Sequence, residues 1–499
     1  MYISLAMVNS TRINFAVWLK TSGSVASHEC DTSAPSNGRV ILGSKVELER
    51  RVRQNLLECR EMMANIEEFP EPLSAKYREQ FAYPTIKDRL PTILTRVVDT
   101  VYQYKNKAFE EFGEDGPEDC KFIVSKLSEL KNYMQTDKAL KALEDDREDV
   151  EIWNEFIEKE KEKYGASFPS WFKSPWLLVE CYMYRRINDI IRLSSNLKDY
   201  DPFGDQKRHA FIVSNEAEII LSEYLNGVTK DSKAATYEVF SEFVQIALWG
   251  NKCDLSISAG IENSQKVSPL AHLQQMKSKI LVDGTPQLWQ TLQDSRKDAK
   301  PVRVDIVLDN AGFELFGDLC FAEYLLRSSL ADVIHMHYKA MPWFVSDVTL
   351  SDFIWTLQTM ADDPSPVLSH LGKSWQRRLQ DGSWVIKGDI FWTTHYDFSK
   401  MKSIAPKLYQ DLSESALCFF KGDLNYRKLV GDLNWKHTTP YDVTLRGFHP
   451  SAQCSLRALK ADLILGLKEG QAEAVEKEYS DWMISGNFAV IQFSGKVEK

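Results

Sequence analysis

The chain has 499 residues, of which 43% are hydrophobic and 26% are charged, which is ordinary for a soluble globular protein and long enough for two or three domains. Its 61 basic and 71 acidic residues give a net charge of −10, which argues against nucleic acid or an anionic membrane as a partner. No apolar run approaches the roughly 18 residues of a membrane-spanning helix. The eight cysteines include no Cys-x-x-Cys pair, so we expect reduced, buried thiols in an intracellular protein of the cytoplasm, with the nucleus as a second compartment. The oligomeric state is not indicated.

Residues 1–46 are predicted to be a disordered N-terminal extension. Ser, Gly, Thr, Pro and Asn are frequent at 21–44, and such a composition buries little apolar surface. Acidic residues in the extension are unlike a mitochondrial presequence, and basic residues interrupt the apolar core that a secretory signal needs.

Residues 47–235 are predicted to form an all-helical cap domain. An apolar stripe at 93–101 has the three- and four-residue spacing of one helix face. A run with paired tryptophans and prolines, 168–176, opens a further helix that carries Glu180 and Arg185. These two side chains could reach an active site, but we favour structural ion pairing.

Residues 236–499 are predicted to form an α/β/α domain. It begins near 248–256, a stretch containing Trp and Gly that we interpret as a turn. Asn251 and Asp254 lie in this stretch. They either form the turn or support a metal site nearby.

The core of this domain is a predicted strand–helix–strand unit at 302–347. An apolar, β-branched run at 304–308 indicates a buried parallel strand, a helical pattern follows at 313–330, and 333–338 is a second apolar run. A right-handed crossover makes the two strands parallel. Asp309 and Asn310 then follow the first strand and Asp347 follows the second, at the sheet edge where such folds bind ligands.

Asp309, Asn310 and Asp347 are the predicted metal ligands. Carboxylate and amide oxygens suit Mg²⁺ or Mn²⁺ and, with less preference, Co²⁺ or Ni²⁺. The N–H groups that open the next helix would add an anion site, so the pattern suggests a phosphorylated substrate. His335 and His337 could also bind a transition metal, but a hydrogen-bonded pair inside the fold is favoured.

A later apolar run at 416–420 predicts another buried strand that delivers a charged segment to the same edge. Basic residues that could together neutralise a phosphate there are Lys421, Arg427, Lys428, Arg457 and Lys460. Further strands are predicted at 384–386, 389–392, 463–465 and 490–493. Five or more strands alternating with helices predict a doubly wound three-layer α/β/α sheet domain beside the N-terminal helical domain.

Four ordered segments resemble the damage-control phosphatase family, and its eukaryotic branch in particular, over about residues 75–495. They are Asp309-Asn310-Ala311-Gly312-Phe313-Glu314-Leu315, Pro342-Trp343-Phe344-Val345-Ser346-Asp347, Lys421-Gly422-Asp423-Leu424-Asn425-Tyr426-Arg427-Lys428 and Arg457-Ala458-Leu459-Lys460. The last resembles the Arg-Thr-x-Lys motif of that branch, with Ala458 in place of threonine.

The resemblance implies a metal-dependent phosphatase that acts on small sugar phosphates, such as fructose 1-phosphate and fructose 6-phosphate, in metabolite damage control. It implies that the substrate is contacted by Asp309, Asn310, Asp347, Asp423, Leu424, Asn425, Tyr426, Arg427 and Lys460. Supporting roles are expected for Arg457, Lys421, Asn251, Asp254 and Glu180.

The expected catalytic residues are Asp309, Asp347 and Asp423. Asp309 or Asp347 orients or activates the attacking water, and Asp423 accepts a proton or fixes a sugar hydroxyl. Lys460 and Arg427 are expected to stabilise the charge that develops on the phosphoryl group.

Two other functions are compatible with the chain. The family is also associated with carboxyl methyl transfer from S-adenosylmethionine to acidic residues of proteins, but the sequence contains no Gly-x-Gly-x-x-Gly loop. The non-enzymatic alternative is a helical scaffold with an inactive sheet domain, and the intact set of Asp309, Asn310 and Asp347 argues against it.

Overall fold

A computed structural model describes residues 69–230, 235–262, 276–297 and 300–496, and from residue 251 to 262 it describes the helical backbone alone. The predicted N-terminal extension, 1–46, lies outside the described residues. The described part belongs to one compact unit. None of its helices is both long enough and apolar enough to cross a bilayer.

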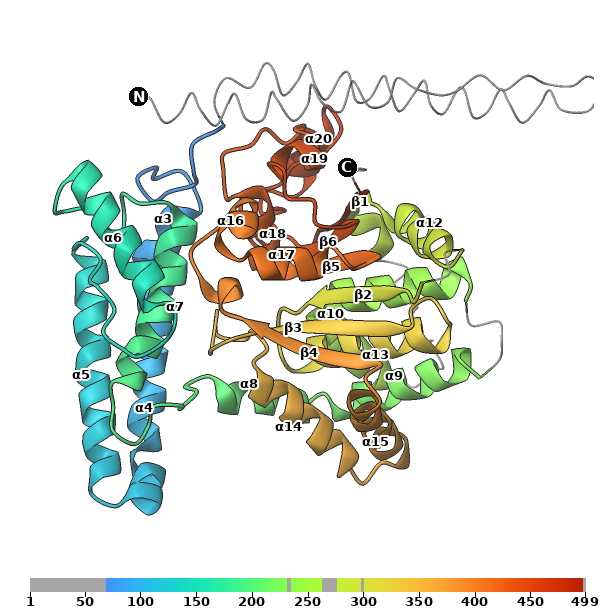
Figure 1. Ribbon diagram of the computed structural model, residues 1–499, viewed down its shortest axis with the longest axis horizontal. Coiled ribbons are helices and arrows are strands. Elements are labelled where there is room, and N and C mark those ends of the chain that lie inside the picture. The colour runs from blue at the N-terminus through green and yellow to red at the C-terminus, as the bar shows by residue number, and fades with distance from the viewer. Residues whose placement is uncertain (1–68, 231–234, 263–275, 298–299, 497–499) are drawn as a thin grey trace, which may run out of the picture. The chain divides into compact units, whose positions relative to one another are not determined.

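A seven-stranded sheet forms the centre of the fold, in the order β1-β7-β6-β5-β2-β3-β4 (Figure 1). The strands are β1 Ile280–Asp283, β2 Arg303–Val307, β3 Val333–Lys339, β4 Trp384–Asp389, β5 Leu417–Lys421, β6 Gln453–Ala458 and β7 Ala489–Ser494. Neighbouring strands are parallel except β6 and β7, which are antiparallel. The sheet is therefore mixed, and the predicted α/β class is confirmed.

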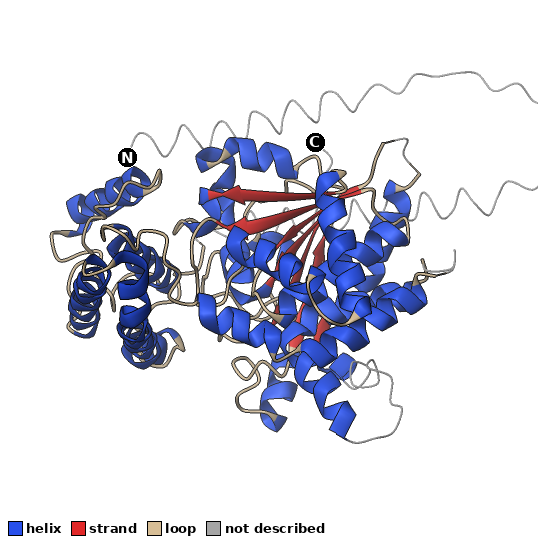
Figure 2. Cartoon of the chain, turned by 90° about the horizontal axis from the view of Figure 1, so that it is seen from below, coloured by secondary structure: helices blue, strands red, loops and turns tan. Residues whose placement is uncertain are grey.

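Alternate side chains of the central strands enter two different cores, and helices consequently cover both faces (Figure 2). Val304 and Ile306 of β2 pack in one core, whereas Val307 packs in the other. The helices of the first core are α8 Gly204–Ile212, α9 Asn215–Val228, α10 Tyr237–Glu262, α12 Thr285–Ser295, α13 Phe313–Arg327, α14 Leu350–Ala361 and α15 Pro366–Gln380. The second core includes α16 Met401–Ile404, α17 Pro406–Leu412, α18 Gly422–Val430, α19 Tyr441–Thr444 and α20 Gln471–Glu478.

The N-terminal helices continue this second core. They are α3 Ala82–Pro84, a π-helical turn Thr85–Arg89, α4 Leu90–Phe112, α5 Asp115–Gln135, α6 Val150–Tyr164 and α7 Trp176–Arg192. Helix α7 is buried along almost its whole length. Helices α8 and α9 fall inside the range predicted for the cap, 47–235, yet they pack in the sheet core with α13 and α14. The boundary near 235 stays a prediction.

Two of the predicted strands are wrong. At 463–465 the chain is buried but irregular, because side chains rather than a neighbouring strand donate to its carbonyls. The donors are Arg457 to Leu463, His437 to Ile464 and Gln492 to Leu465. At 389–392 the carboxylate of Asp389 accepts from the N–H of Phe391 at 2.8 Å, which ends β4 and starts a 3₁₀ turn, Ile390–Thr393.

The predicted turn at 248–256 is also wrong, since these residues continue helix α10. Gly250 has a packing role there. A Cβ at this position would lie 2.6 Å from Cγ and 2.9 Å from Cα of Glu314, so the glycine lets α10 and α13 approach closely. Asn251 and Asp254 are therefore helical residues, and their side chains lie outside the described part of the chain.

The cysteines with described side chains are all buried and unpaired: Cys120, Cys181, Cys320, Cys418 and Cys454. This agrees with the expected buried thiols.

Candidate active site

Backbone hydrogen bonds join the segments that follow β2 and β3. The N–H of Val348 donates to the carbonyl of Asp309, and the N–H of Ala311 donates to the carbonyl of Ser346, each at 2.8 Å. Asn310 and Asp347 form an isolated antiparallel bridge within this pairing. The structure therefore places the three predicted metal ligands next to one another at the carboxyl edge of the sheet.

Gly422 lets the start of α18 approach the same point. Its φ is +82°, and a Cβ at this position would lie 1.9 Å from Oδ2 and 2.1 Å from Cγ of Asp309. Only glycine fits so close to the carboxylate, and its conformation also favours glycine. The third of the four quoted segments, which contains Gly422, is therefore brought to Asp309 by its backbone.

The carboxylates at this edge are buried and crowded. Asp309 is 8% exposed and Asp347 is 2% exposed. Burial, together with the charges of Glu314 and Asp347, raises the pKa of Asp309 well above its ordinary value. Burial also raises the pKa of Asp347, although the Nζ of Lys339, 3.1 Å from its Oδ2, opposes this. A bound cation would relieve this crowding.

Asn310 connects these groups through its amide. Its Nδ2 donates to Asp309 Oδ2 and to Glu314 Oε2, both at 2.8 Å, and its Oδ1 accepts from the Oγ of Ser346 at 2.5 Å. The amide nitrogen, and not the oxygen of the predicted metal ligand, thus faces the carboxylates. To act as an oxygen ligand on that side, the amide would have to turn over.

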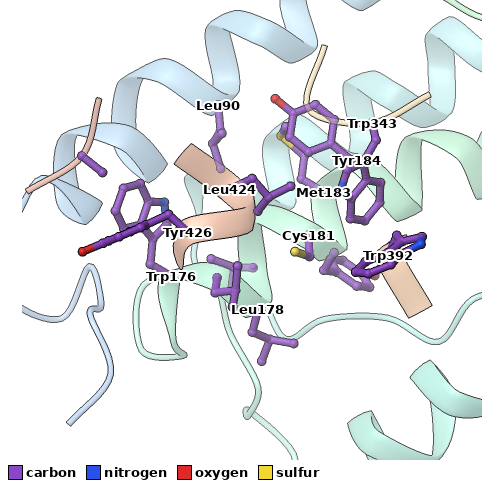
Figure 3. Close-up of a cluster of buried hydrophobic side chains, with 14 of the residues drawn as sticks. Leu90, Trp176, Leu178, Cys181, Met183, Tyr184, Trp343, Trp392, Leu424 and Tyr426 are labelled. Atoms are coloured by element: carbon purple, nitrogen blue, oxygen red, sulfur yellow. The ribbon is translucent and has the colours of Figure 1, made fainter. Parts of the chain in front are cut away.

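A cavity of about 330 Å³ is lined by these residues, a size typical of small-molecule sites. Asp423, Leu424, Arg427 and Lys460, for which the family resemblance implies contact with the substrate, also line it. Its apolar lining includes Trp176, Leu248, Trp249, Phe344, Leu424 and Leu456. Figure 3 shows Trp176, Tyr184 and Leu424 gathered in one buried cluster, where the N-terminal helices meet α18.

Two predicted substrate contacts are not part of the cavity as the described residues line it. Asn425 is 1% exposed, and its Nδ2 donates to the carbonyl of Lys421 at 2.7 Å. Tyr426 is fully buried between Arg457, 4.2 Å from its ring centre, and Tyr441. Asn425 also donates to the carbonyls of Val307 and Leu308 at the end of β2, so both side chains contact the protein interior and not the cavity.

The predicted cluster of phosphate-binding cations is also largely engaged elsewhere. Lys421 lies 2.9 Å from Asp318 and 3.3 Å from Glu314, and Lys428 donates to the carbonyls of Trp392 and Thr394. The partners of both buried ammonium groups lie inside the protein. Neither lysine lines the cavity in the described structure, so neither is placed to bind phosphate.

Arg457 is a supporting residue that holds Asp423. Its Nε donates to Asp423 Oδ1 at 2.8 Å, and its other nitrogens donate to the carbonyls of Leu463 and Ala461. Although burial raises the pKa of Asp423, the charges of Arg457 and Arg427 outweigh it, and the pKa is lowered. Asp423 is therefore an ionised acceptor at the cavity wall.

Arg427 links the N-terminal helices to α18. Its guanidinium contacts Glu180 at 2.5 Å and Asp432 at 2.8 Å, and it lies over the ring of Trp176 at 3.6 Å. Glu180 and Arg427 both line the cavity, but each already has a charged partner. The favoured interpretation of Glu180 as an ion-pairing residue agrees with this geometry. Arg185 is likewise paired, with Asp145 and Asp149.

A second group of described residues has metal-ligand spacing. Ligand atoms of Asp305, His335 and Asp411 lie within 4.8 Å of one another. Both carboxylates already hold cations, because Arg303 contacts Asp305 at 2.8 Å and Asp411 at 3.0 Å, and Lys387 contacts Asp411 at 2.7 Å. The charges are thus balanced without a metal. We assign this group to a partly buried ion-pair network.

His335 and His337 both face this network, on the same side of β3. His337 Nε2 lies 2.7 Å from Asp305 Oδ1, and His335 Nδ1 lies 3.8 Å from the same atom. The favoured interpretation, histidines held within the fold, agrees with this arrangement.

Several residues of the cavity were not predicted from the sequence. Glu314 and Gly422 lie in the quoted motifs, but no role was predicted for either residue. In the structure Glu314 accepts a hydrogen bond from Asn310, and Gly422 lies close against Asp309 because it has no side chain. Phe344, in another motif, has a positive φ of 44° and stacks on Tyr184 at 4.7 Å. Arg89 comes from the N-terminal helices, where an arginine in a short charged stretch carries no signal.

The fold and the site together define a class of enzyme. Crowded carboxylates at the carboxyl edge of parallel strands, beside a cavity with basic side chains, are the arrangement of a phosphoryl-group hydrolase. The chain matches the sequence profile of the damage-control phosphatase ARMT1-like domain over residues 85–475. It therefore belongs to the damage-control phosphatase family, and it is a phosphatase of metabolite repair.

Two relatives identified by sequence agree with this assignment. The chain is 47% identical over 435 residues to a protein of Danio rerio named damage-control phosphatase ARMT1, covering 85% of this chain and 97% of that protein. It is 40% identical over 435 residues to the Homo sapiens protein of the same name, covering 85% and 99%. A solved structure of a DUF89 family protein from Pyrococcus horikoshii aligns at a TM-score of 0.34 and 15% identity, over 69% of this chain and 91% of that one. The methyltransferase and scaffold alternatives are not favoured.

Proposed function

We propose that this phosphatase hydrolyses small sugar phosphates, with fructose 1-phosphate and fructose 6-phosphate as the expected substrates, and that it does so with a divalent cation. The observation that carries the proposal is the cavity of about 330 Å³. It joins the buried carboxylates of Asp309 and Asp347 to polar groups and aromatic side chains. A phosphorylated sugar has one anionic end and one end rich in hydroxyls, and both kinds of partner line the same cavity.

The residues present fit a hard divalent cation. Asp309 and Asp347 are buried oxygen donors, and burial together with the charge of Glu314 raises both of their pKa values, so a bound cation would favour their ionised form. Asn310 would join them through its oxygen. A bound Mn²⁺, Mg²⁺, Co²⁺ or Ni²⁺ would supply charge neutralisation for the carboxylates and the phosphoryl oxygens.

The other roles in the reaction are assigned to individual side chains of the cavity. Asp309 or Asp347, once ionised, accepts a hydrogen bond from the attacking water and orients it. Lys460 offers a cation to the phosphoryl oxygens. Asp423 is held ionised by Arg457, which supports its use as an acceptor for a sugar hydroxyl rather than as a proton donor. Trp176 and Phe344 offer apolar surface to the sugar carbons.

The test is a phosphatase assay on a panel of phosphorylated sugars with each of the four metals, with and without EDTA. The variants are Asp309→Asn and, as a matched control, Asp442→Asn, an exposed aspartate outside the cavity. We expect kcat to fall by about 100-fold or more in Asp309→Asn and to vanish with EDTA, while Asp442→Asn matches the wild type. Full activity of the wild type in EDTA would refute the requirement for a metal. Absence of turnover on the whole panel would refute sugar phosphates as the substrate class.

We further propose that the enzyme works in the cytoplasm and also in the nucleus, because its expected substrates are soluble metabolites. Imaging of the tagged full-length chain in cells tests this. Accumulation inside a membrane-bound organelle of the secretory pathway would contradict it.

A further inference from the structure

Two of the basic side chains that line the cavity have no charged partner among the described residues. The cavity is lined by Arg89, Arg427 and Lys460. Arg427 is held by Glu180 and Asp432. Within the described part of the chain, the side chains of Arg89 and Lys460 take part in no hydrogen bond or ion pair, and both residues are exposed. They are therefore the cations that remain available to a ligand.

The backbone around Arg89 is shaped so that this side chain reaches the cavity. Thr85–Arg89 is a π-helical turn, and the N–H of Leu90 donates to the carbonyl of Thr85, five residues back. Ile86 and Leu90 are fully buried on either side of it, and Figure 3 shows Leu90 in the cluster with Leu424 and Trp176. The neighbours are thus anchored in the core while Arg89 stays outside it. Such single π-turns occur frequently at functional sites.

Arg89 and Lys460 reach the cavity from different elements. Lys460 follows β6, which ends at Ala458, and it lines the cavity together with Asp309 and Asp423. Arg89 is the last residue of the π-helical turn before α4. The sheet and the N-terminal helices therefore each contribute one cation to the cavity.

A phosphate monoester suits a pair of cations placed in this way. It carries close to two negative charges and presents several acceptor oxygens, and the planar guanidinium of arginine can donate two parallel hydrogen bonds to them. The ammonium group of Lys460 adds a point charge to the same ligand. No acidic side chain of the described structure is paired with Arg89, so its charge is offered to the ligand.

We propose that Arg89, which belongs to the N-terminal helices, binds the phosphoryl group of the substrate together with Lys460. This assignment rests on the proposed function, because it requires a phosphorylated substrate in this cavity. It adds a residue outside the sheet domain to the site. The N-terminal helices then recognise the phosphate and do not merely cover the site.

The experiment compares Arg89→Gln and Arg89→Lys with Arg96→Gln in the full-length chain. Arg96 is an exposed arginine of α4 that does not line the cavity, so it controls for the loss of one positive charge on the same helix. Steady-state kinetics with fructose 1-phosphate and the best metal give KM and kcat. Competitive inhibition by inorganic phosphate gives a binding constant for the anion alone, and titration of the metal, monitored by calorimetry, gives the affinity of the metal site.

We expect Arg89→Gln to raise the inhibition constant of inorganic phosphate by about 10- to 100-fold and to lower kcat/KM by the same factor. Arg89→Lys keeps the positive charge but loses the planar guanidinium group. Its inhibition constant and its kcat/KM should therefore lie between those of the wild type and those of Arg89→Gln. Metal affinity should be unchanged in both variants, and Arg96→Gln should behave as the wild type.

An active wild type whose inhibition by phosphate is the same in Arg89→Gln would overturn the role of Arg89 and leave the proposed function standing. A loss of metal affinity in Arg89→Gln would also overturn it, since the effect would then be on the site as a whole. A wild type that hydrolyses no sugar phosphate would refute the proposed function, and this assignment with it.

Discussion

Substitution of Gly422 by alanine tests whether the contact between α18 and Asp309 sets the geometry of the site. The change adds one methyl group. In the structure that methyl group would lie 1.9 Å from Oδ2 of Asp309 and 2.1 Å from its Cγ. Neither atom can remain in place, so either the carboxylate or the start of α18 has to move.

The size of the effect follows from two separate costs. The first is conformational, because Gly422 has a φ of +82°, and an alanine there costs about 1–2 kcal/mol of stability. The second is positional, because the carboxylate must move by about 1 Å, and a misplacement of that size can cost about 100-fold in rate. We therefore expect a moderate loss of stability and a much larger loss of kcat.

The chain contains a matched control for the first cost. Gly447 has a similar φ of +87°, but a Cβ there would meet nothing within 4 Å. Gly447→Ala should therefore lose about 1–2 kcal/mol and keep its activity. Urea-induced unfolding measures the stability of both variants, and kcat is measured with the best sugar phosphate at a temperature where both are folded. Activity of Gly422→Ala within threefold of that of Gly447→Ala would refute the reasoning.

The remaining predictions concern the interior of the protein. His395 packs against Trp153 and Phe156, and burial, with Lys428 nearby, lowers its pKa to about 3. Because the unfolded chain binds a proton at higher pH than the folded protein does, His395 should cost the fold about 2 kcal/mol between pH 7 and pH 5. Urea unfolding of His395→Phe should show a weaker loss on acidification, and an unchanged pH profile would contradict this. Glu180→Gln leaves the buried guanidinium of Arg427 with one carboxylate, and we expect a loss of about 1.5–3 kcal/mol in the same assay; a loss below about 0.5 kcal/mol would speak against the pair. Asp305→Asn should keep its metal content by mass spectrometry, as expected for an ion-pair network, whereas Asp309→Asn should lose it; the reverse result would move the metal site.

The candidate site shows where reasoning from the chain was sufficient. Asp309, Asn310 and Asp347 were placed correctly at one edge because a parallel strand–helix–strand unit has few possible geometries, and both strands end in polar residues. The basic residues that bind a ligand were harder to predict. Lys421, Arg427, Lys428 and Arg457 stand in the expected segments, yet each is turned to a partner inside the protein.

The sequence by itself determined the fold class, the parallel direction of the central strands β2 and β3, and the residues that end them. These follow from hydrophobic periodicity and chain connectivity, which are local properties. Only the tertiary structure decided which charged side chains remain available to a ligand. That depends on partners distant in the chain, such as Glu180 for Arg427 or Asp318 for Lys421, because a buried charge must be paired wherever its partner comes from. For the same reason Arg89, which has no such partner in the described structure and lies at the cavity, was found in the fold and not in the sequence.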